Sequence, residues 1–190
     1  MALPRLSTDG TVLLVVDVQE RLMPTIDAAA RVEANCAILA RAAGVLGMPV
    51  VCTEQYVKGL GHTTPHVRGA LPAGAKVFEK TRFSALVPPL ADWLAAHGRR
   101  QVVLCGVEAH VCVLQTALDL RAAGCTPFLA TDAISAGQPQ QIGPALRRLD
   151  LAGCIPTGCL SAMYELAQDA SNPLFKGMLG LAKAIRQLPA

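Results

Sequence analysis

Residues 101–124 read QVVLCGVEAHVCVLQTALDLRAAG and contain one complete strand-and-helix unit. The apolar run at residues 101–105 predicts a short buried strand. Residues 110–123 carry apolar side chains at helical spacing, and Gly124 can end that helix. A strand that is apolar throughout is typical of a parallel sheet, because helices cover such a sheet on both faces.

The same unit recurs on both sides of this stretch. Further strands are predicted at residues 11–17, 49–53, 76–78, 126–130 and 153–155, and further helices at residues 28–46, 87–97, 138–149 and 160–167. Strands that alternate with helices imply right-handed crossovers and a parallel sheet. We therefore predict an α/β fold with three α/β/α layers and a six-stranded parallel sheet.

No linker or repeat interrupts this pattern, so residues 1–190 are predicted to form a single domain. Residues 54–75 contain several glycines and prolines and are predicted to be a long loop. The tail at residues 168–190 has apolar side chains at helical spacing from residue 175 to 188. It should dock on the domain as an amphipathic helix.

The composition excludes several classes of protein. Hydrophobic residues make up 52% of the chain and charged residues only 16%, whereas about 25% charged residues is usual. This excludes disorder and predicts a homo-oligomer that covers apolar surface. The net charge of +3 has no basic stripe and aromatic residues are 4%, so no nucleic-acid partner is expected.

The sequence also predicts where the protein works. Its apolar runs are far shorter than the ~18 residues of a membrane-spanning helix, so we expect no membrane association. The N-terminus does not resemble a signal peptide. Seven cysteines without a paired C-x-x-C spacing are typical of a reduced, cytoplasmic protein.

Three chemically reactive residues follow three of the predicted strands. Asp17 follows the first strand, Lys80 the third and Cys112 the fourth. Because ligands of such folds bind beyond the carboxyl ends of the strands, these side chains should meet there. A helix N-terminus and a nearby cation lower the pKa of a thiol, so Cys112 is expected to be an activated nucleophile.

Five other residues lie at strand ends or in the long loop and are candidates for binding the substrate or its oxyanion. They are Gln19, Tyr56, Phe83, Glu108 and His110. His110 is the best of these candidates because it lies two residues before Cys112. For each of them, a capping or surface role is an equally open interpretation.

Three segments carry a family resemblance. VVDVQ at residues 15–19, EKTRFS at 79–84 and GVEAHVCV at 106–113 resemble, in order, the signature segments of the isochorismatase-like cysteine hydrolases. TEQYVKGLG at residues 53–61 and NPLFK at 172–176 resemble the narrower isochorismatase domain-containing subgroup. The likeness to the family runs in order from about residue 10 to residue 165.

The resemblance implies a catalytic role for each residue of the cluster. Asp17 would be the general base, Lys80 would stabilise charge and Cys112 would attack a carbonyl carbon. The resemblance also implies a cis peptide between Val107 and Glu108. This bond would turn the N–H of Glu108 toward that of Cys112 to form an oxyanion hole.

The resemblance also narrows the reaction. True isochorismatases lack the nucleophilic cysteine, so the presence of Cys112 favours hydrolysis of a C–N bond. The expected substrate is a small amide or carbamoyl compound that passes through a thioester-type intermediate. Nicotinamidases resemble this family but add an Asp-x-His…His metal site after the second strand, and this chain has Glu54-Gln-Tyr56 there instead. Pro65 argues against a helix that would align His62 with His66. No metal and no cofactor are therefore predicted.

Three other functions can be compared with the sequence. A nucleotide-binding oxidoreductase would need Gly-x-Gly-x-x-Gly after the first strand, which the sequence lacks. A thiol redox sensor at Cys112 would need a resolving cysteine, and Cys159 is the candidate that the fold could bring close. A family member that has lost catalysis and serves as an oligomeric scaffold also fits the sequence.

Overall fold

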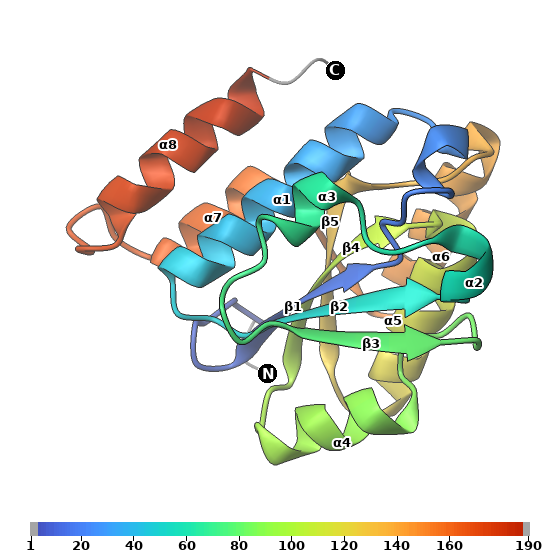
Figure 1. The fold of residues 1–190 in the computed structure, drawn as a ribbon. Coiled ribbons are helices and arrows are strands. Elements are labelled where there is room, and N and C mark those ends of the chain that lie inside the picture. The colour runs from blue at the N-terminus through green and yellow to red at the C-terminus, as the bar shows by residue number, and fades with distance from the viewer. Residues whose placement is uncertain (1–3, 188–190) are drawn as a thin grey trace.

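The computed structural model describes residues 4–187, which form one parallel sheet with helices on both faces (Figure 1). The strands are β1 (Thr11–Val16), β2 (Val50–Gln55), β3 (Lys76–Lys80), β4 (Gln101–Val107), β5 (Thr126–Ser135) and β6 (Ile155–Thr157). Their order in the six-stranded sheet is β3-β2-β1-β4-β5-β6. All neighbours in the sheet are parallel, which confirms the predicted fold class.

Two helical layers cover this sheet. The helices are α1 (Ala29–Val45), α2 (Val57–Leu60), α3 (Pro65–Arg68), α4 (Pro88–Ala96), α5 (Leu114–Ala122), α6 (Ile142–Leu151), α7 (Cys159–Ala167) and α8 (Phe175–Arg186). Short helical turns also occur at η1 (Met23–Thr25), η2 (Ala109–Val113, a π-helix) and η3 (Pro139–Gln141). The core under α1, α3, α7 and α8 lies on one face of the sheet, and the core under α4, α5 and α6 lies on the other.

The central strands are apolar throughout because both of their faces are buried. In β1, Val12, Leu14 and Val16 pack under α4–α6. Leu13 and Val15 alternate with them and pack under α1. This alternation follows from the two-residue period of a strand, and it explains why the run showed no polar face in the sequence.

Several predicted boundaries were wrong. The stretch at residues 54–75 is not a continuous loop: β2 extends through Gln55, and the short helices α2 and α3 follow. Pro65 begins α3, where its missing N–H costs no helical hydrogen bond. β3, β4 and β5 also run beyond their predicted ends, and β6 begins at Ile155 rather than at residue 153.

The strand order changes direction between β1 and β4. The chain builds outward from β1 through β2 to β3, and then returns to build β4, β5 and β6 on the other side. Gly106 lies at this point with φ of 113°, and a Cβ there would collide with the backbone of Val16. This close approach requires glycine, and it brings the carboxyl ends of β1 and β4 together.

Over the described residues, the C-terminal tail contains the helix α8. α8 packs against α1 and α7, with Met178 and Ala182 buried beneath it. The predicted end of this helix at residue 188 lies outside the described residues. No helix within residues 4–187 has the length and apolar character needed to cross a membrane.

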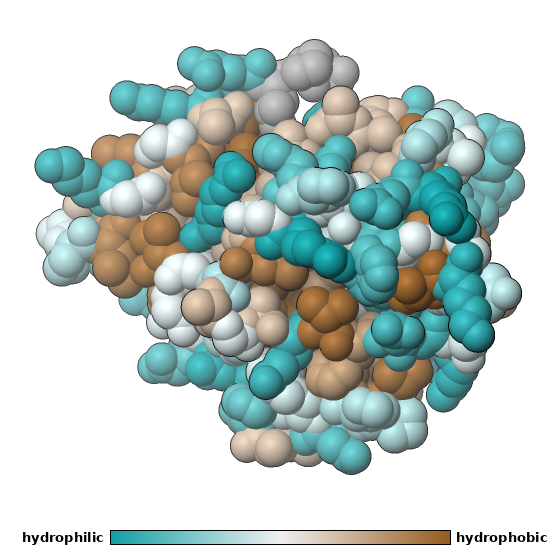
Figure 2. Space-filling model, in the orientation of Figure 1, coloured by the Kyte–Doolittle hydropathy of each residue, from teal (hydrophilic) through white to brown (hydrophobic). Residues whose placement is uncertain are grey.

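Besides Leu151 at the end of α6, the exposed apolar side chains of the described residues fall into two groups. Figure 2 shows hydrophobic surface over β3 and near α7 and α8. The first group comprises Val77 on β3 with Tyr56 and Phe83 close in sequence to the strand ends, and the second includes Tyr164, Leu174 and Leu179.

Candidate active site

Asp17, Lys80 and Cys112 converge at the carboxyl ends of β1, β3 and β4. Lys80 Nζ lies 2.6 Å from Asp17 Oδ2, and both side chains are completely buried. Lys80 reaches over the end of β2 to make this contact, since β2 separates β3 from β1. Both charged groups also act on the thiol of Cys112. We call these three residues the Asp–Lys–Cys cluster.

Asp17 is held through both its backbone and its side chain. It leaves β1 with φ of 53°, a left-handed conformation that few residues other than glycine adopt. Its N–H donates to the carbonyl of Thr53 at 3.2 Å. The hydroxyl of Thr53 donates to Asp17 Oδ1 at 2.7 Å. Each carboxylate oxygen therefore accepts one hydrogen bond, Oδ1 from Thr53 and Oδ2 from Lys80.

The ammonium of Lys80 is surrounded by hydrogen-bond acceptors from residues 4–187. Besides Asp17, Gln55 Oε1 lies 2.9 Å from Nζ, and the carbonyls of Arg82 and Phe83 lie at 3.2 and 3.0 Å. An ammonium has three N–H donors, and these four acceptors engage all of them. Lys80 therefore holds Asp17 and the turn after β3 together.

Cys112 lies in the first turns of the helix that begins as η2 and continues as α5. The residue is 6% exposed. Burial raises the pKa of the Cys112 thiol to about 12, the negative charge of Asp17 adds to the rise, and Lys80 acts in the opposite direction. The predicted lowering of this pKa was wrong, because burial and Asp17 outweigh the nearby cation.

Gln19 does not line a binding surface, contrary to our expectation. It is completely buried, and its amide nitrogen donates to the carbonyls of Gln55 and Gly61 at 2.9 and 2.6 Å. Its amide oxygen accepts from the N–H of Gln55 at 2.7 Å. Because both ends of the amide contact backbone, Gln19 ties the end of β2 to the segment that follows it.

The other four candidates lie around the Asp–Lys–Cys cluster with different exposure. Tyr56 and Phe83 are 56% and 53% exposed. Glu108 Oε2 accepts from the N–H of Gly137 at 2.7 Å, which is a structural contact. His110 Nδ1 is buried and has no hydrogen-bond partner among the described residues. The peptide bond between Val107 and Glu108 is cis.

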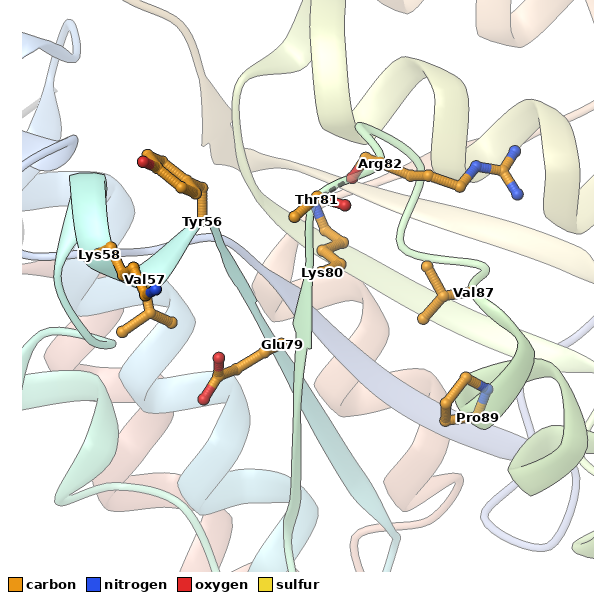
Figure 3. A pocket seen from close by; sticks show the side chains of 9 residues that line it. All are labelled: Tyr56, Val57, Lys58, Glu79, Lys80, Thr81, Arg82, Val87 and Pro89. Atoms are coloured by element: carbon orange, nitrogen blue, oxygen red, sulfur yellow. Dashed lines mark hydrogen bonds between the residues drawn. The ribbon is translucent and has the colours of Figure 1, made fainter.

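A pocket of about 650 Å³ opens beside the cluster. Residues 56–58, residues 79–82, Val87 and Pro89 line it (Figure 3). Lys80 is the member of the cluster that belongs to this lining. The pocket thus joins the end of β3 to the first turn of α4, with apolar and charged side chains on its walls.

A second polar network surrounds Glu54 on the opposite face of β2. Glu54 Oε1 accepts from the N–H and hydroxyl of Thr63 at 2.7 and 2.8 Å and from Arg68 Nη2 at 3.1 Å. His62 Nδ1 lies 2.9 Å from Glu54 Oε2. Burial works to raise the pKa of the Glu54 carboxyl, but the hydrogen bonds from Thr63 and His62 lower it overall.

The side-chain contact of His62 is therefore with the carboxylate of Glu54. His66 lies within α3, whereas His62 precedes that helix. In the part of the chain that the structure describes, no three His, Cys, Asp or Glu side chains are arranged to hold a metal ion.

The sheet separates Cys112 from Cys159. Cys112 belongs to the core under α4–α6, and Cys159 is completely buried in the core under α1 and α7. All seven cysteines are free thiols. Cys159 therefore cannot act as the resolving cysteine that a redox sensor at Cys112 would need.

Two contacts of the cluster were not foreseen from the sequence. Thr53 and Gln55 lie two residues apart on β2 and contact Asp17 and Lys80 from the same face of the sheet. Their positions directly before the loop, in a strand that neighbours β1, were the available signal. That signal is weak, because threonine is common in strands for reasons of packing alone.

The fold and the arrangement of its layers define a three-layer α/β/α protein whose polar cluster lies where the strand order changes. The isochorismatase domain family matches residues 11–159. The chain belongs to this family, and at a coarse level it is an isochorismatase-like hydrolase.

Individual relatives agree over nearly the whole chain. Isochorismatase domain-containing protein 2 from Danio rerio is 40% identical over 173 residues, which cover 90% of this chain and 86% of the relative. The structure of MAR1 ribonuclease from Caenorhabditis elegans superposes with a TM-score of 0.91 at 33% identity and covers 98% of both chains. YcaC from Escherichia coli, described as an octameric hydrolase of unknown specificity, superposes with a TM-score of 0.86 at 22% identity. It covers 98% of this chain and 96% of its own, and at this identity the likeness concerns the fold alone.

Proposed function

We propose that this protein is a cysteine hydrolase that cleaves the C–N bond of a small amide or carbamoyl compound through a thioester-type intermediate. The observation that carries the proposal is the buried contact between Asp17 and Lys80 beside the thiol of Cys112. A thiol with a carboxylate base within reach is the arrangement that nucleophilic attack on a carbonyl needs.

The first half of the reaction forms the covalent intermediate. Asp17 takes the thiol proton of Cys112 while Sγ bonds to the carbonyl carbon, and the C=O electron pair moves to the oxygen. The backbone N–H groups of Glu108 and Cys112 stabilise the oxyanion. The oxyanion collapses, the C–N bond breaks, and the leaving nitrogen takes the proton from Asp17.

The second half releases the product. Asp17 takes a proton from a water molecule, whose oxygen attacks the thioester carbon. Collapse of this second oxyanion breaks the C–S bond, and the thiolate takes the proton back from Asp17. The sum is amide plus water giving acid plus amine, and Lys80 keeps its protons throughout.

The raised pKa of Cys112 favours proton transfer during the attack over a thiolate that exists beforehand. A thiol with a pKa of about 12 is neutral at pH 7 and needs a base at the moment of reaction. Asp17 lies where that base is needed. Because the same carboxylate also raises the thiol pKa, proton transfer and attack are expected to be coupled.

The pocket at Lys80 has the size of a small-molecule site, although its lining includes neither Cys112 nor Asp17. Its volume of about 650 Å³ lies within the range of about 300–1,000 Å³ that is usual for small-molecule sites. Val57, Val87 and Pro89 offer apolar walls. Lys58 and Arg82 bring positive charge, and Glu79 brings a negative charge. These walls fit a compact amide with an apolar body.

The test of this proposal compares two buried cysteines. Ammonia release from acetamide, propionamide, benzamide, nicotinamide and N-carbamoylglycine is measured for the wild type and for Cys112→Ala and Cys125→Ala. Cys125 is the matched control, since it is also 6% exposed and lies in the same core. Turnover should vanish in Cys112→Ala and persist in Cys125→Ala. Full activity in Cys112→Ala would exclude the mechanism, and a wild type silent on the whole panel would favour the scaffold alternative.

Cleavage of RNA is a second candidate, favoured by the likeness to the MAR1 ribonuclease of Caenorhabditis elegans. Lys58 and Arg82 at the pocket offer two cations for phosphates. The same variants separate the two functions on a labelled single-stranded RNA. Cleavage that persists in Cys112→Ala would assign the activity to groups other than the thiol.

We also propose that the protein is a homo-oligomer. Val77, Tyr56 and Phe83 expose apolar surface near the edge strand β3, and the octameric state of YcaC supports assembly in this fold. Light scattering coupled to size exclusion measures the mass directly. A mass of 19.9 kDa, that of the single chain, would contradict the proposal.

A further inference from the structure

Two residues of β2 hold Asp17 and Lys80 of the Asp–Lys–Cys cluster in place through hydrogen bonds. Thr53 is completely buried and contacts Asp17 twice. Its carbonyl accepts the Asp17 N–H at 3.2 Å, and its hydroxyl donates to Asp17 Oδ1 at 2.7 Å. The backbone and the carboxylate of Asp17 are therefore both fixed by one residue.

The hydroxyl contact decides how the carboxylate is turned. Rotation about the Cβ–Cγ bond of aspartate is soft, because this sp³–sp² torsion has a broad energy profile. Lys80 holds Oδ2 at 2.6 Å, and this single anchor leaves the torsion free. Thr53 supplies the second anchor on Oδ1, and two anchors fix the plane of the carboxylate and the direction of its remaining lone pairs.

Gln55 fixes the position of Lys80, which is the second hydrogen-bond partner of the Asp17 carboxylate. Its amide nitrogen donates to the carbonyl of Thr81 at 2.9 Å, and this contact fixes which way the amide faces. Gln55 Oε1 must then face Lys80 Nζ, which lies 2.9 Å away. The ammonium that orients Asp17 is itself oriented from β2.

We propose that Thr53 is a positioning residue that turns the carboxylate of Asp17 toward the thiol of Cys112. This inference rests on the proposed role of Asp17 as the base for Cys112. Thr53 touches neither substrate nor thiol in this scheme and acts through Asp17. The contrasting possibility is that Thr53 only satisfies a buried carboxylate oxygen and supports the fold.

The test uses three threonine variants and the reaction of Cys112 with iodoacetamide, in which a base removes the thiol proton as the C–S bond forms and iodide leaves. Thr53→Val removes the hydroxyl and Thr53→Ser retains it. Thr11→Val is the matched control, because Thr11 is also completely buried and donates its hydroxyl to Gln101 Oε1 at 2.9 Å at the other end of the sheet. Peptide mapping gives the labelling rate of Cys112 at pH 8.

General-base assistance is worth about 10²–10⁴-fold, so a misdirected base should slow labelling by about tenfold or more in Thr53→Val. Thr53→Ser should stay within about threefold of the wild type, because the hydroxyl that orients the base remains. Thr11→Val should react like the wild type, although it also removes the hydrogen-bonded hydroxyl of a buried threonine. If Thr53→Val does not fold, Thr53→Ala serves as the variant without a hydroxyl. A wild-type rate in either of them, or a Thr53→Ser rate as slow as that of Thr53→Val, would overturn the proposal.

The labelling experiment separates the positioning role of Thr53 from the proposed hydrolase activity. Labelling needs no substrate, so it reports on Thr53 even if none of the amides is hydrolysed. On an amide that is hydrolysed, Thr53→Val should lower kcat and leave KM unchanged. A crystal structure of Thr53→Val completes the test if Cys112 resists labelling. The Asp17 carboxylate should have rotated in it, and an unchanged carboxylate would refute the positioning role.

Discussion

Asp17 and Glu54 are buried carboxylates at the carboxyl ends of neighbouring strands, yet they face opposite sides of the sheet. Asp17 points into the side that holds Cys112 under α4–α6. Glu54 points to the other side, where Thr63 and Arg68 of the α3 region surround it. The two strands β1 and β2 are adjacent, with Val16 paired to Thr53.

The two carboxylates differ in how fully they are hydrogen-bonded. A carboxylate offers about four lone-pair positions. Glu54 accepts four hydrogen bonds, three of them on Oε1, whereas Asp17 accepts one side-chain hydrogen bond on each oxygen. Glu54 accepts twice as many hydrogen bonds as Asp17 and anchors the segment after β2. Asp17 retains lone pairs that accept no side-chain hydrogen bond. These lone pairs can take the proton of the nearby thiol, and this is how the proposed base differs from the structural carboxylate of Glu54.

Removing the negative charge of Asp17 and of Glu54 in turn should give the largest difference between the two carboxylates. Asp17→Asn should lower amide turnover by about 10²–10⁴-fold, because an amide cannot take the thiol proton. Glu54→Gln should leave kcat within about twofold, because Glu54 lies outside the proton path. Steady-state kinetics of both variants on one amide measures the contrast. Equal losses in the two variants would refute the distinction.

A second comparison concerns the cation that accompanies each carboxylate. Lys80→Met leaves Asp17 buried and unpaired, which should cost about 3–5 kcal/mol of unfolding free energy. Arg68→Met removes a side chain that is 54% exposed, and such pairs contribute about 0–1 kcal/mol. Urea unfolding at pH 7 measures both values. A loss below about 1 kcal/mol in Lys80→Met would show that the Asp17–Lys80 pair does not support the fold.

The smallest expected effect is the dependence of stability on pH that arises from Glu54. Its pKa is below the ordinary value of 4.5 in the folded protein, so the unfolded chain binds a proton more readily. Its contribution to stability is therefore complete above about pH 4.5 and is lost as the pH falls through the folded pKa. The stability difference between the wild type and Glu54→Gln should shrink from pH 6 to pH 3.5 in urea titrations. A difference that widens on acidification would contradict this assignment.

The order of the elements could be predicted because the central strands β1 and β4 are apolar runs and most of the helices, such as α1 and α5, end near a glycine. The meeting of Asp17, Lys80 and Cys112 followed from the same pattern, since residues after parallel strands share one edge of the sheet. Thr53 and Gln55 escaped prediction because their contacts depend on the pairing register of β1 with β2. Sequence alone does not set that register to one residue.

The pKa of Cys112 escaped prediction for a different reason. A helix N-terminus and Lys80 are visible in the sequence, but the degree of burial is not. Cys112 lies in a core that is built from segments far apart in sequence. One of these residues is Ala85 after β3, whose N–H donates to the hydroxyl of Thr116 on α5 at 2.7 Å. Such packing exists only in the folded protein, and it reverses the sign of the expected shift.

The enclosure of Lys80 makes its ammonium a spectroscopic reporter. Exposed lysine ammonium protons exchange with water too quickly to be followed individually, whereas protons that are buried and hydrogen-bonded exchange slowly. Because Lys80 is completely buried and its Nζ faces four acceptors, its ¹⁵N resonance should stand apart from those of the other lysines. Heteronuclear NMR can then follow the state of Asp17 through its neighbour, in solution and before any substrate is known.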